Sequence, residues 1–359
     1  MMKKYLLIIA TLAWTHTLWA QAGPQPAAKS PIKEGWNVTT ATGLNLGQMS
    51  FNSNWAAGGL NVFSINGQVD LTANYLKGLD EKTTKIAWVN NLKINYGVQK
   101  PEGFAVQKAV DNLKFSSMLA YRIAKDLIIP GDALYVGKIT SLFTQIAPGY
   151  LHQFKLPDGT VVNWGQSEGF TNNPFTGDRI NPRKGLRISN FMAPGYLWVR
   201  AGFRYLFSMK GQDAIFLQFA PLSLKQTYLI DSDIRLSKEQ LANPQLAGFD
   251  IYGTGGKSVK TTTGTTFDVD LKLPLVLLTP ALKNVIFVTD TVFFTSYEDP
   301  AFDMLASFVL QGKINKHLSA KIMTHMIYNN DVDTDIGKPG KQTGLQVMGN
   351  FGVGITLVF

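Results

Sequence analysis

Charged side chains fall at alternate positions in several segments, opposite the apolar side chains. In YLWVRAGFRYLF, Arg200 and Arg204 oppose Leu197, Val199 and Phe203. Fixed charges on the polar face of a strand are suited to lining a pore, where they select ions or solutes. The same alternation assigns to the lumen face Asp70, Lys93, Arg122, Arg200, Arg204, Asp303, Lys313, Lys321 and His325. Basic groups outnumber acids in this set, which predicts a weak preference for anions.

Histidine would be needed for catalysis, because a hydrolytic barrel requires His beside Ser or Asp at a strand end. After the first twenty residues the chain has His152, His317 and His325. We expect His152 at a loop mouth, His317 in a tight turn and His325 as a hydrogen-bonded member of a polar face. This distribution predicts that the chain is not an enzyme and has no cofactor. The alternative is a membrane enzyme that uses His325 or His152.

Acidic and basic loop segments offer two further binding chemistries. Asp331, Asp333 and Asp335 alternate like the ligands of a calcium loop, but the Glu that closes such a site is absent. We therefore expect an acidic loop and no metal. A basic set could pair with lipopolysaccharide phosphates or remain solvated, namely Arg183, Lys184, Arg187, Lys257 and Lys260. No aromatic side chains interleave with these bases, so nucleic-acid binding is not predicted.

The elements that position these residues are long amphipathic strands. Apolar and polar residues alternate over more residues than the roughly 9 to 11 that cross a tilted barrel wall. An uninterrupted apolar stretch long enough for a spanning helix is absent after the N-terminus, so a membrane form must be a closed barrel. Twelve such segments are expected at 37–49, 60–76, 84–98, 111–125, 133–147, 189–207, 213–228, 263–274, 284–296, 302–313, 317–329 and 344–359. Fourteen strands remain an alternative if a long loop hides a hairpin, and a secreted β-sandwich or propeller is the soluble alternative.

The lengths of the connections support this count. Turns such as INKH and KGLDEKT fall on one side, and the long loops 148–188, 229–262 and 330–343 fall on the other. This asymmetry is typical of outer-membrane barrels, whose periplasmic turns are short. Tyr, Trp or Phe ends each apolar face, as an aromatic girdle would require. The fold class predicted is an all-β transmembrane antiparallel barrel of 12 strands with long extracellular loops.

Both chain ends fit export to such a membrane. Residues 1–20 have the order of a cleaved secretory signal peptide, with two lysines, an apolar run and a small residue. Residues 21–35 form a Pro- and Ala-rich periplasmic lead-in, and 36–359 the barrel. The last strand alternates up to the end, so Phe359, Leu357 and Ile355 are expected to serve as an insertion signal for the barrel-insertion machinery. Cysteine is absent from the chain.

Several blocks also resemble a known family. They are SFNSNWAAGGLNVFSINGQVDLTANYLKG (50–78), WVNNLKINYG (88–97), TQIAPGY (144–150), SNFMAPGYLWVRAGFRY (189–205), FAPLSLKQTYLID (219–231) and INKHLSAKIMTHMIYNND (314–331). In this order they resemble the exported proteins of domain of unknown function 3078. The resemblance implies an outer-membrane barrel of the Bacteroidota, and it implies no reaction.

Two functions follow as hypotheses. The first is a narrow, porin-like passive channel or small-solute transporter, whose lumen is either open or filled by side chains and an infolded loop. The second is a structural or accessory subunit that docks partner proteins in an outer-membrane complex. In both, lipid and lipopolysaccharide surround the barrel.

Overall fold

The computed structural model covers the barrel and part of its loops. It describes residues 33–49, 62–79, 84–101, 106–130, 132–151, 153–155, 161–163, 171–172, 179–180, 186–209, 212–242, 252, 254–277, 279–298, 300, 302–314, 318–328 and 345–358. The predicted signal peptide, most of the predicted lead-in and Phe359 lie outside these residues.

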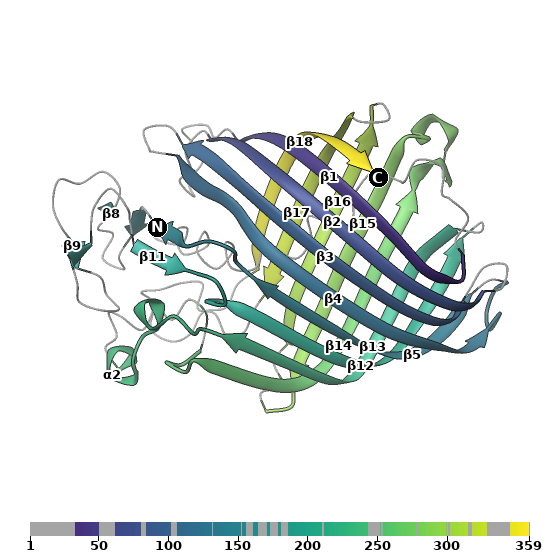
Figure 1. Ribbon diagram of the computed structural model, residues 1–359, viewed down its shortest axis with the longest axis horizontal. Coiled ribbons are helices and arrows are strands. Elements are labelled where there is room, and N and C mark those ends of the chain that lie inside the picture. Colours follow the sequence, from purple (N-terminus) through teal and green to yellow (C-terminus); the bar gives the residue numbers. More distant parts are fainter. Residues whose placement is uncertain are drawn as a thin grey trace.

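Twelve antiparallel strands form a closed barrel (Figure 1). In wall order they are β1 (Gly35–Met49), β2 (Val62–Leu79), β3 (Thr84–Pro101), β4 (Gln107–Lys125), β5 (Ala133–Thr144), β12 (Gly195–Met209), β13 (Gln212–Tyr228), β14 (Val259–Pro274), β15 (Val285–Ser296), β16 (Phe302–Lys313), β17 (Leu318–Tyr328) and β18 (Gln346–Val358). β18 closes the wall by pairing with β1, where Leu357 lies opposite Thr42 and Ile355 opposite Leu44. This pairing runs over Ala41–Gly47 and Gly352–Val358, so the wall has no edge strand, as a membrane environment requires.

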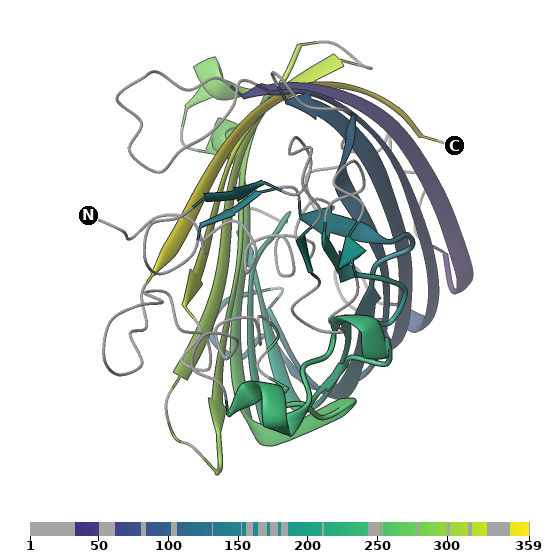
Figure 2. The ribbon, with the colours of Figure 1, turned by 90° about the vertical axis from the view of Figure 1, so that its left-hand side faces the viewer.

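The predicted count of twelve wall strands is confirmed. The long segment between β5 and β12 does contain short strands, but none of them joins the wall. Three two-stranded sheets form there, of β6 (Gly149–Leu151) with β11 (Leu186–Ser189), β7 (Gln153–Lys155) with β8 (Val161–Asn163), and β9 (Thr171–Asn172) with β10 (Arg179–Ile180). Seen from the long-loop end, short strands of this segment stand in front of the barrel opening (Figure 2).

Two predicted strands extended three or more residues beyond the observed ones, and β4 and β14 each begin four residues before their predicted starts. β5 ends at Thr144 instead of 147, and β12 begins at Gly195 instead of 189. Pro194 lies within the stretch lost from β12, and Pro148 directly follows the stretch lost from β5; proline has no N–H to donate to a ladder. These residues instead form the two ends of the long segment at the barrel mouth.

The long connections gather at one end of the barrel, as predicted, although two short ones, 102–106 and 297–301, lie there too. At one end, the short-turn end, strands are joined by residues 80–83, 126–132, 210–211, 275–284 and 314–317. The opposite, long-loop end carries 145–194 and 229–258. The helices are brief: η1 (Ser232–Ile234), α2 (Lys238–Leu241), η2 (Leu275–Leu277) and η3 (Pro280–Leu282). Among the described residues, no helix has the length and apolar character needed to cross a membrane.

The outer wall exposes a broad apolar surface. Its exposed side chains include Val38, Leu44, Leu46, Phe63, Ile65, Val69, Leu71, Phe115, Leu119, Val136, Phe203, Phe219, Phe267, Leu310, Ile322 and Val353. Aromatic contacts occur near both ends, between Trp36 and Trp88 at the short-turn end and between Phe302 and Tyr328 at the long-loop end. An exposed surface of this extent needs an apolar solvent, and the aromatic ends match the girdles of a transmembrane barrel.

The inner wall is polar in its middle and apolar toward the short-turn end. Ala120, Ala133, Tyr135 and Leu206 form one buried cluster there. A second cluster joins β15, β16 and β17 through Val288, Val309 and Met323. Side chains thus fill part of the lumen at that end, as expected for a barrel of intermediate size.

Candidate functional site

A cavity of about 390 Å³ lies inside the barrel. Strands from β2 round to β16 contribute to its lining. Its charged lining residues are four bases and three acids, namely Lys93, Lys114, Arg200, Arg204, Asp268, Asp270 and Asp290. Buried charges require partners, so their arrangement decides what the cavity can bind.

Two arginines of β12 make ion pairs with β14 across the intervening β13. Arg200 donates through Nη1 to Asp268 Oδ2. Arg204 Nη2 lies 3.5 Å from Asp270 Oδ2. The Arg204 guanidinium also covers the Phe216 ring, with its central carbon 4.4 Å from the ring centroid. These contacts hold both guanidinium groups in the cavity lining.

Like charges stand directly opposite each other at two places in the lining. Lys93 of β3 is the register partner of Lys114 of β4. Asp270 of β14 is the register partner of Asp290 of β15. Such pairs are destabilising in a sheet unless other groups compensate them. Compensation is visible for Lys93, whose Nζ is 3.5 Å from Asp70 Oδ2, and for Asp270 through Arg204.

The Arg200–Asp268 ion pair leaves one polar atom of each side chain without a hydrogen-bond partner among the described residues. Arg200 Nε and Asp268 Oδ1 are buried and have no hydrogen-bond partner in the described part of the chain. One is a donor and the other an acceptor, and both residues line the cavity. One donor and one acceptor are therefore left unsatisfied by the described residues beside the cavity.

Aromatic side chains line the cavity toward the long-loop end. Phe143 and Tyr196 have ring centroids 6.1 Å apart, and Trp198 contacts Phe294 edge to face. Lys225 lies against Trp198 and pairs with Asp303 at 3.3 Å, although neither charged residue lines the cavity. The charged cavity is therefore bordered by aromatic rings on this side.

The predicted lumen residues divide into two groups. Lys93, Arg200 and Arg204 line the cavity, with Asp70 bound to Lys93. Lys321 is buried in β17, opposite Gln311, and is outside the lining. Arg122, Asp303 and Lys313 are likewise outside it.

Some predicted positions have no described side chain. His325 lies opposite Ser307 in the β16–β17 register, but its side chain is not described. The same holds for Ile355 and Leu357 in β18. His152, His317, Arg183, Lys184 and the acidic loop of Asp331, Asp333 and Asp335 lie outside the described residues.

The excess of positive charge in this cavity is smaller than predicted, because the sequence analysis missed three of its acids. Asp268 and Asp270 alternate with Phe267, Val269 and Leu271 in β14, so the same alternation rule would have found them. Asp290 lies in a predicted strand whose faces were not assigned, whereas Lys114 shares its strand and face with Arg122, so the alternation rule would have found it too. Four bases against three acids leave the lining nearly balanced in charge.

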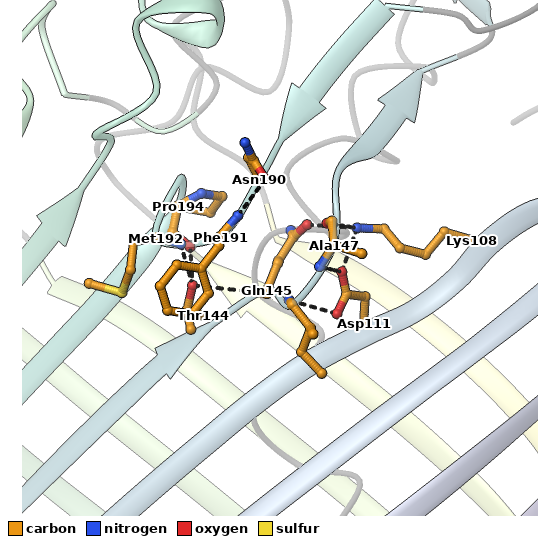
Figure 3. Close-up of polar contacts among 10 residues, drawn as sticks. Lys108, Asp111, Thr144, Gln145, Ala147, Asn190, Phe191, Met192 and Pro194 are labelled. Carbon is orange, nitrogen blue, oxygen red and sulfur yellow. Dashed lines mark hydrogen bonds and ion pairs between the residues drawn. The ribbon is translucent and has the colours of Figure 1, made fainter.

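The long segment at the mouth begins at a polar anchor on β4 (Figure 3). Asp111 of β4 is 1% exposed and accepts hydrogen bonds from the backbone N–H groups of Ile146 and Ala147, both at 2.7 Å. Lys108 donates to Asp111 at 2.7 Å and to Gln145 at 3.0 Å. This end of the segment is therefore fixed to the inner side of β4 by a buried carboxylate.

The return arm of the segment binds beside it. Thr144 Oγ1 accepts from the Met192 N–H at 2.7 Å (Figure 3). The five residues from Ala147 and the five from Ala193 share the sequence APGYL, a repeat that the sequence analysis did not notice. Arg187 pairs with Asp231 and Asp233 of the next long loop, so it is already engaged within the protein.

A second buried carboxylate organises the short-turn end between β4 and β5. Asp132 accepts from the N–H groups of Leu127, Ile128 and Ile129 and from the Tyr205 hydroxyl. Burial opposes ionisation of this carboxyl, but the hydrogen bonds outweigh it and lower the pKa to about 2. The turn is thus held by an ionised aspartate.

Comparison with solved structures finds barrels of several activities. An outer membrane channel from Pseudomonas putida F1 is 9% identical over 94% of this chain and 100% of that one, with a TM-score of 0.38. Outer membrane phospholipase A from Escherichia coli is 12% identical over 98% of each chain, with a TM-score of 0.34. The NalP translocator domain from Neisseria meningitidis is 10% identical over 91% and 90%, with a TM-score of 0.34. The barrel assignment here rests on the strand pairing and not on these likenesses.

The prediction about enzymatic activity needs correction. The sequence analysis predicted that the chain is not an enzyme, but a phospholipase is among the similar barrels. A barrel architecture therefore does not exclude enzymatic activity. A comparison with curated proteins finds no match to this sequence.

The family resemblance, in contrast, is confirmed for the first part of the barrel. The matched residues begin in β1, include the Asp111 anchor and end in β6. Over residues 46–150 the chain matches the family described as "Protein of unknown function (DUF3078)", which has no established activity.

Proposed function

We propose that this protein is a narrow channel for small polar solutes in the outer membrane of a Gram-negative bacterium, exported with residues 1–20 as a cleaved signal peptide. The observation that carries the proposal is the charged cavity of about 390 Å³ inside a closed wall with an apolar exterior. An apolar exterior suits lipid, and a polar interior suits water and solutes. A Bacteroidota origin stays a prediction from the family resemblance.

The interior packing sets the expected size of the pathway. Apolar side chains fill part of the lumen toward the short-turn end, and the APGYL arms lie at the other end. We therefore expect small unitary conductance compared with wide, water-filled barrels. The passage selects by width and by the charges that face the cavity.

Conductance of the purified barrel in planar lipid bilayers tests this proposal. Ser141 lines the cavity, and Thr140 precedes it on the other face of β5. Ser141→Trp is expected to reduce conductance severalfold because the indole occupies cavity space. Thr140→Trp adds the same group to the outer face and should conduct like the wild type.

Two outcomes would overturn the proposal. A correctly folded barrel that stays silent in bilayers would exclude a constitutive channel. Equal conductance of the Ser141→Trp and Thr140→Trp variants would show that ions do not pass through this cavity. A silent barrel that keeps a stoichiometric partner after gentle-detergent purification would favour the accessory-subunit hypothesis.

A further inference from the structure

We infer that the lumen cavity selects zwitterionic solutes that carry both a carboxylate and an ammonium group, of the size of an amino acid or a dipeptide. This inference rests on the proposed channel function and names its solute class. It depends on where the opposite charges lie around the wall.

The lysine pair and the aspartate pair occupy different sectors of the barrel, whereas Arg200 and Arg204 are bound to the acids of β14. The cationic Lys93–Lys114 pair lies on β3 and β4, and the anionic Asp270–Asp290 pair lies on β14 and β15. In the strand order, β3 and β14 are five intervals apart in a ring of twelve, and so are β4 and β15. The two pairs therefore face each other across the lumen from nearly opposite walls.

A zwitterion matches this arrangement of opposite charges better than a simple ion does. Its carboxylate can approach the lysine sector while its ammonium group approaches the aspartate sector. An anion would be attracted by the lysines and repelled by the aspartates. A cation would be attracted by the aspartates and repelled by the lysines. The near balance of four bases and three acids removes the net charge that would favour either simple ion.

The sheet register of these pairs works against stability. Like charges directly opposite in a sheet cost stability, and this lining has one such pair of each sign. Residue pairs that destabilise the fold are expected at functional sites. A bound zwitterion would offset the repulsion in both pairs at once.

Two atoms without hydrogen-bond partners in the described part of the chain also match the two charged groups of a zwitterion. Arg200 Nε can donate to a carboxylate, and Asp268 Oδ1 can accept from an ammonium group. Both atoms are fully buried, so they contact an occupant of the cavity only after their side chains rotate toward it. Among the described residues no three His, Cys, Asp or Glu side chains could hold a metal ion, so the three aspartates do not form a cation site of that kind.

Uptake of four matched solutes into proteoliposomes tests the inference. Diglycine is the zwitterion, N-acetylglycine the anion, glycinamide the cation and N-acetylglycinamide the neutral reference. We expect diglycine to enter roughly tenfold faster than the neutral reference, the factor that about 1.4 kcal/mol of preference gives. The anion and the cation should enter more slowly than diglycine.

Two double variants, each of which leaves the net charge unchanged, test whether the cavity causes the preference for diglycine. Lys114→Gln with Asp290→Asn removes one member of each like-charged pair and should bring the ratio of diglycine to neutral uptake close to one. Lys225→Gln with Asp303→Asn removes an ion pair outside the cavity lining and should keep the wild-type ratio. Heat-modifiable migration on gels confirms that each variant is folded.

The outcomes separate the inference from the channel proposal. Uptake of the neutral solute by the wild type without faster diglycine uptake would overturn the inference and leave the channel intact. Faster uptake of either simple ion than of diglycine would do the same. Failure of every solute to enter liposomes that contain folded barrel would overturn both. Because the wild type alone gives these results, the test holds even if the variants do not fold.

Discussion

Arg204 of β12 and Asp270 of β14 form an ion pair at 3.5 Å although strand β13 lies between them in the wall. The pair therefore links two sides of one curved inner surface, where the closing wall brings non-neighbouring strands within reach of long side chains. Both side chains are about one quarter exposed, so water reaches the pair from the cavity.

A double-mutant cycle on this pair should detect coupling. Arg204→Gln and Asp270→Asn each leave one charge near groups of its own sign, and the double variant removes both. We expect a coupling free energy of about 1 kcal/mol in urea unfolding of the barrel, as for residues in one ionic network. Additive effects of the two changes would show that water screens the pair fully.

Removal of the Asp111 charge should release the long segment at the mouth. Asp111→Asn loses the ion pair with Lys108 and weakens two backbone hydrogen bonds. We expect faster proteolysis within 145–194 while the barrel stays resistant, because breaking a buried pair costs about 3 kcal/mol. Glu298→Gln, an exposed acid at the same end, is the matched control. Equal proteolysis of both variants would contradict the anchoring role.

The Asp132 turn predicts a defined pH dependence. The folded-state pKa of about 2 lies below the ordinary 3.8, so ionised Asp132 contributes stability that is present above about pH 4. This contribution is lost as the pH falls through 2. The unfolding free energy of the wild type should exceed that of Asp132→Asn at pH 7, and the difference should narrow between pH 4 and 2. A difference that stays constant over this range would show that ionisation of Asp132 is irrelevant.

Gly202 tolerates no side chain, because its backbone lies against that of β13. A Cβ atom there would be 2.1 Å from the Phe219 carbonyl oxygen. Gly202→Ala should therefore destabilise the barrel by about 1 to 3 kcal/mol, the usual cost of overpacking. Gly312→Ala is the control, because no atom lies within 4 Å of its Cβ position. The measurement is the urea midpoint of each variant, and equal midpoints would contradict this contact.

Neighbouring residues of β12 should react differently with thiol reagents. Phe203 is 46% exposed on the outer wall, and Arg204 lines the cavity. The chain has no cysteine, so single-cysteine variants are unambiguous. In liposomes, Arg204→Cys should react with a small water-soluble thiosulfonate, and Phe203→Cys with a lipid-soluble maleimide. The reverse pattern would place the polar face against lipid.

Sequence alternation determined much of this fold, because a strand with one apolar and one polar face has a period of two residues that can be read directly. The twelve strands, the short-turn end and the inward direction of Lys93, Arg200 and Arg204 followed from it. Pro194 also marked the true start of β12 inside the predicted strand, and Pro148 directly follows the predicted end of β5.

Only the tertiary structure decided which charges meet. Alternation tells the face of a residue but not its register with another strand, and the closure of the wall sets which strands are opposite. The pairing of Lys93 with Lys114 and of Asp270 with Asp290, and the reach of Arg204 across β13, all depend on that register. The anchoring of residues 145–147 on Asp111 depends on it too, since the two ends of the contact are about 35 residues apart in sequence. Sequence thus determined the two faces of the wall, whereas closure brought together the charges of the cavity.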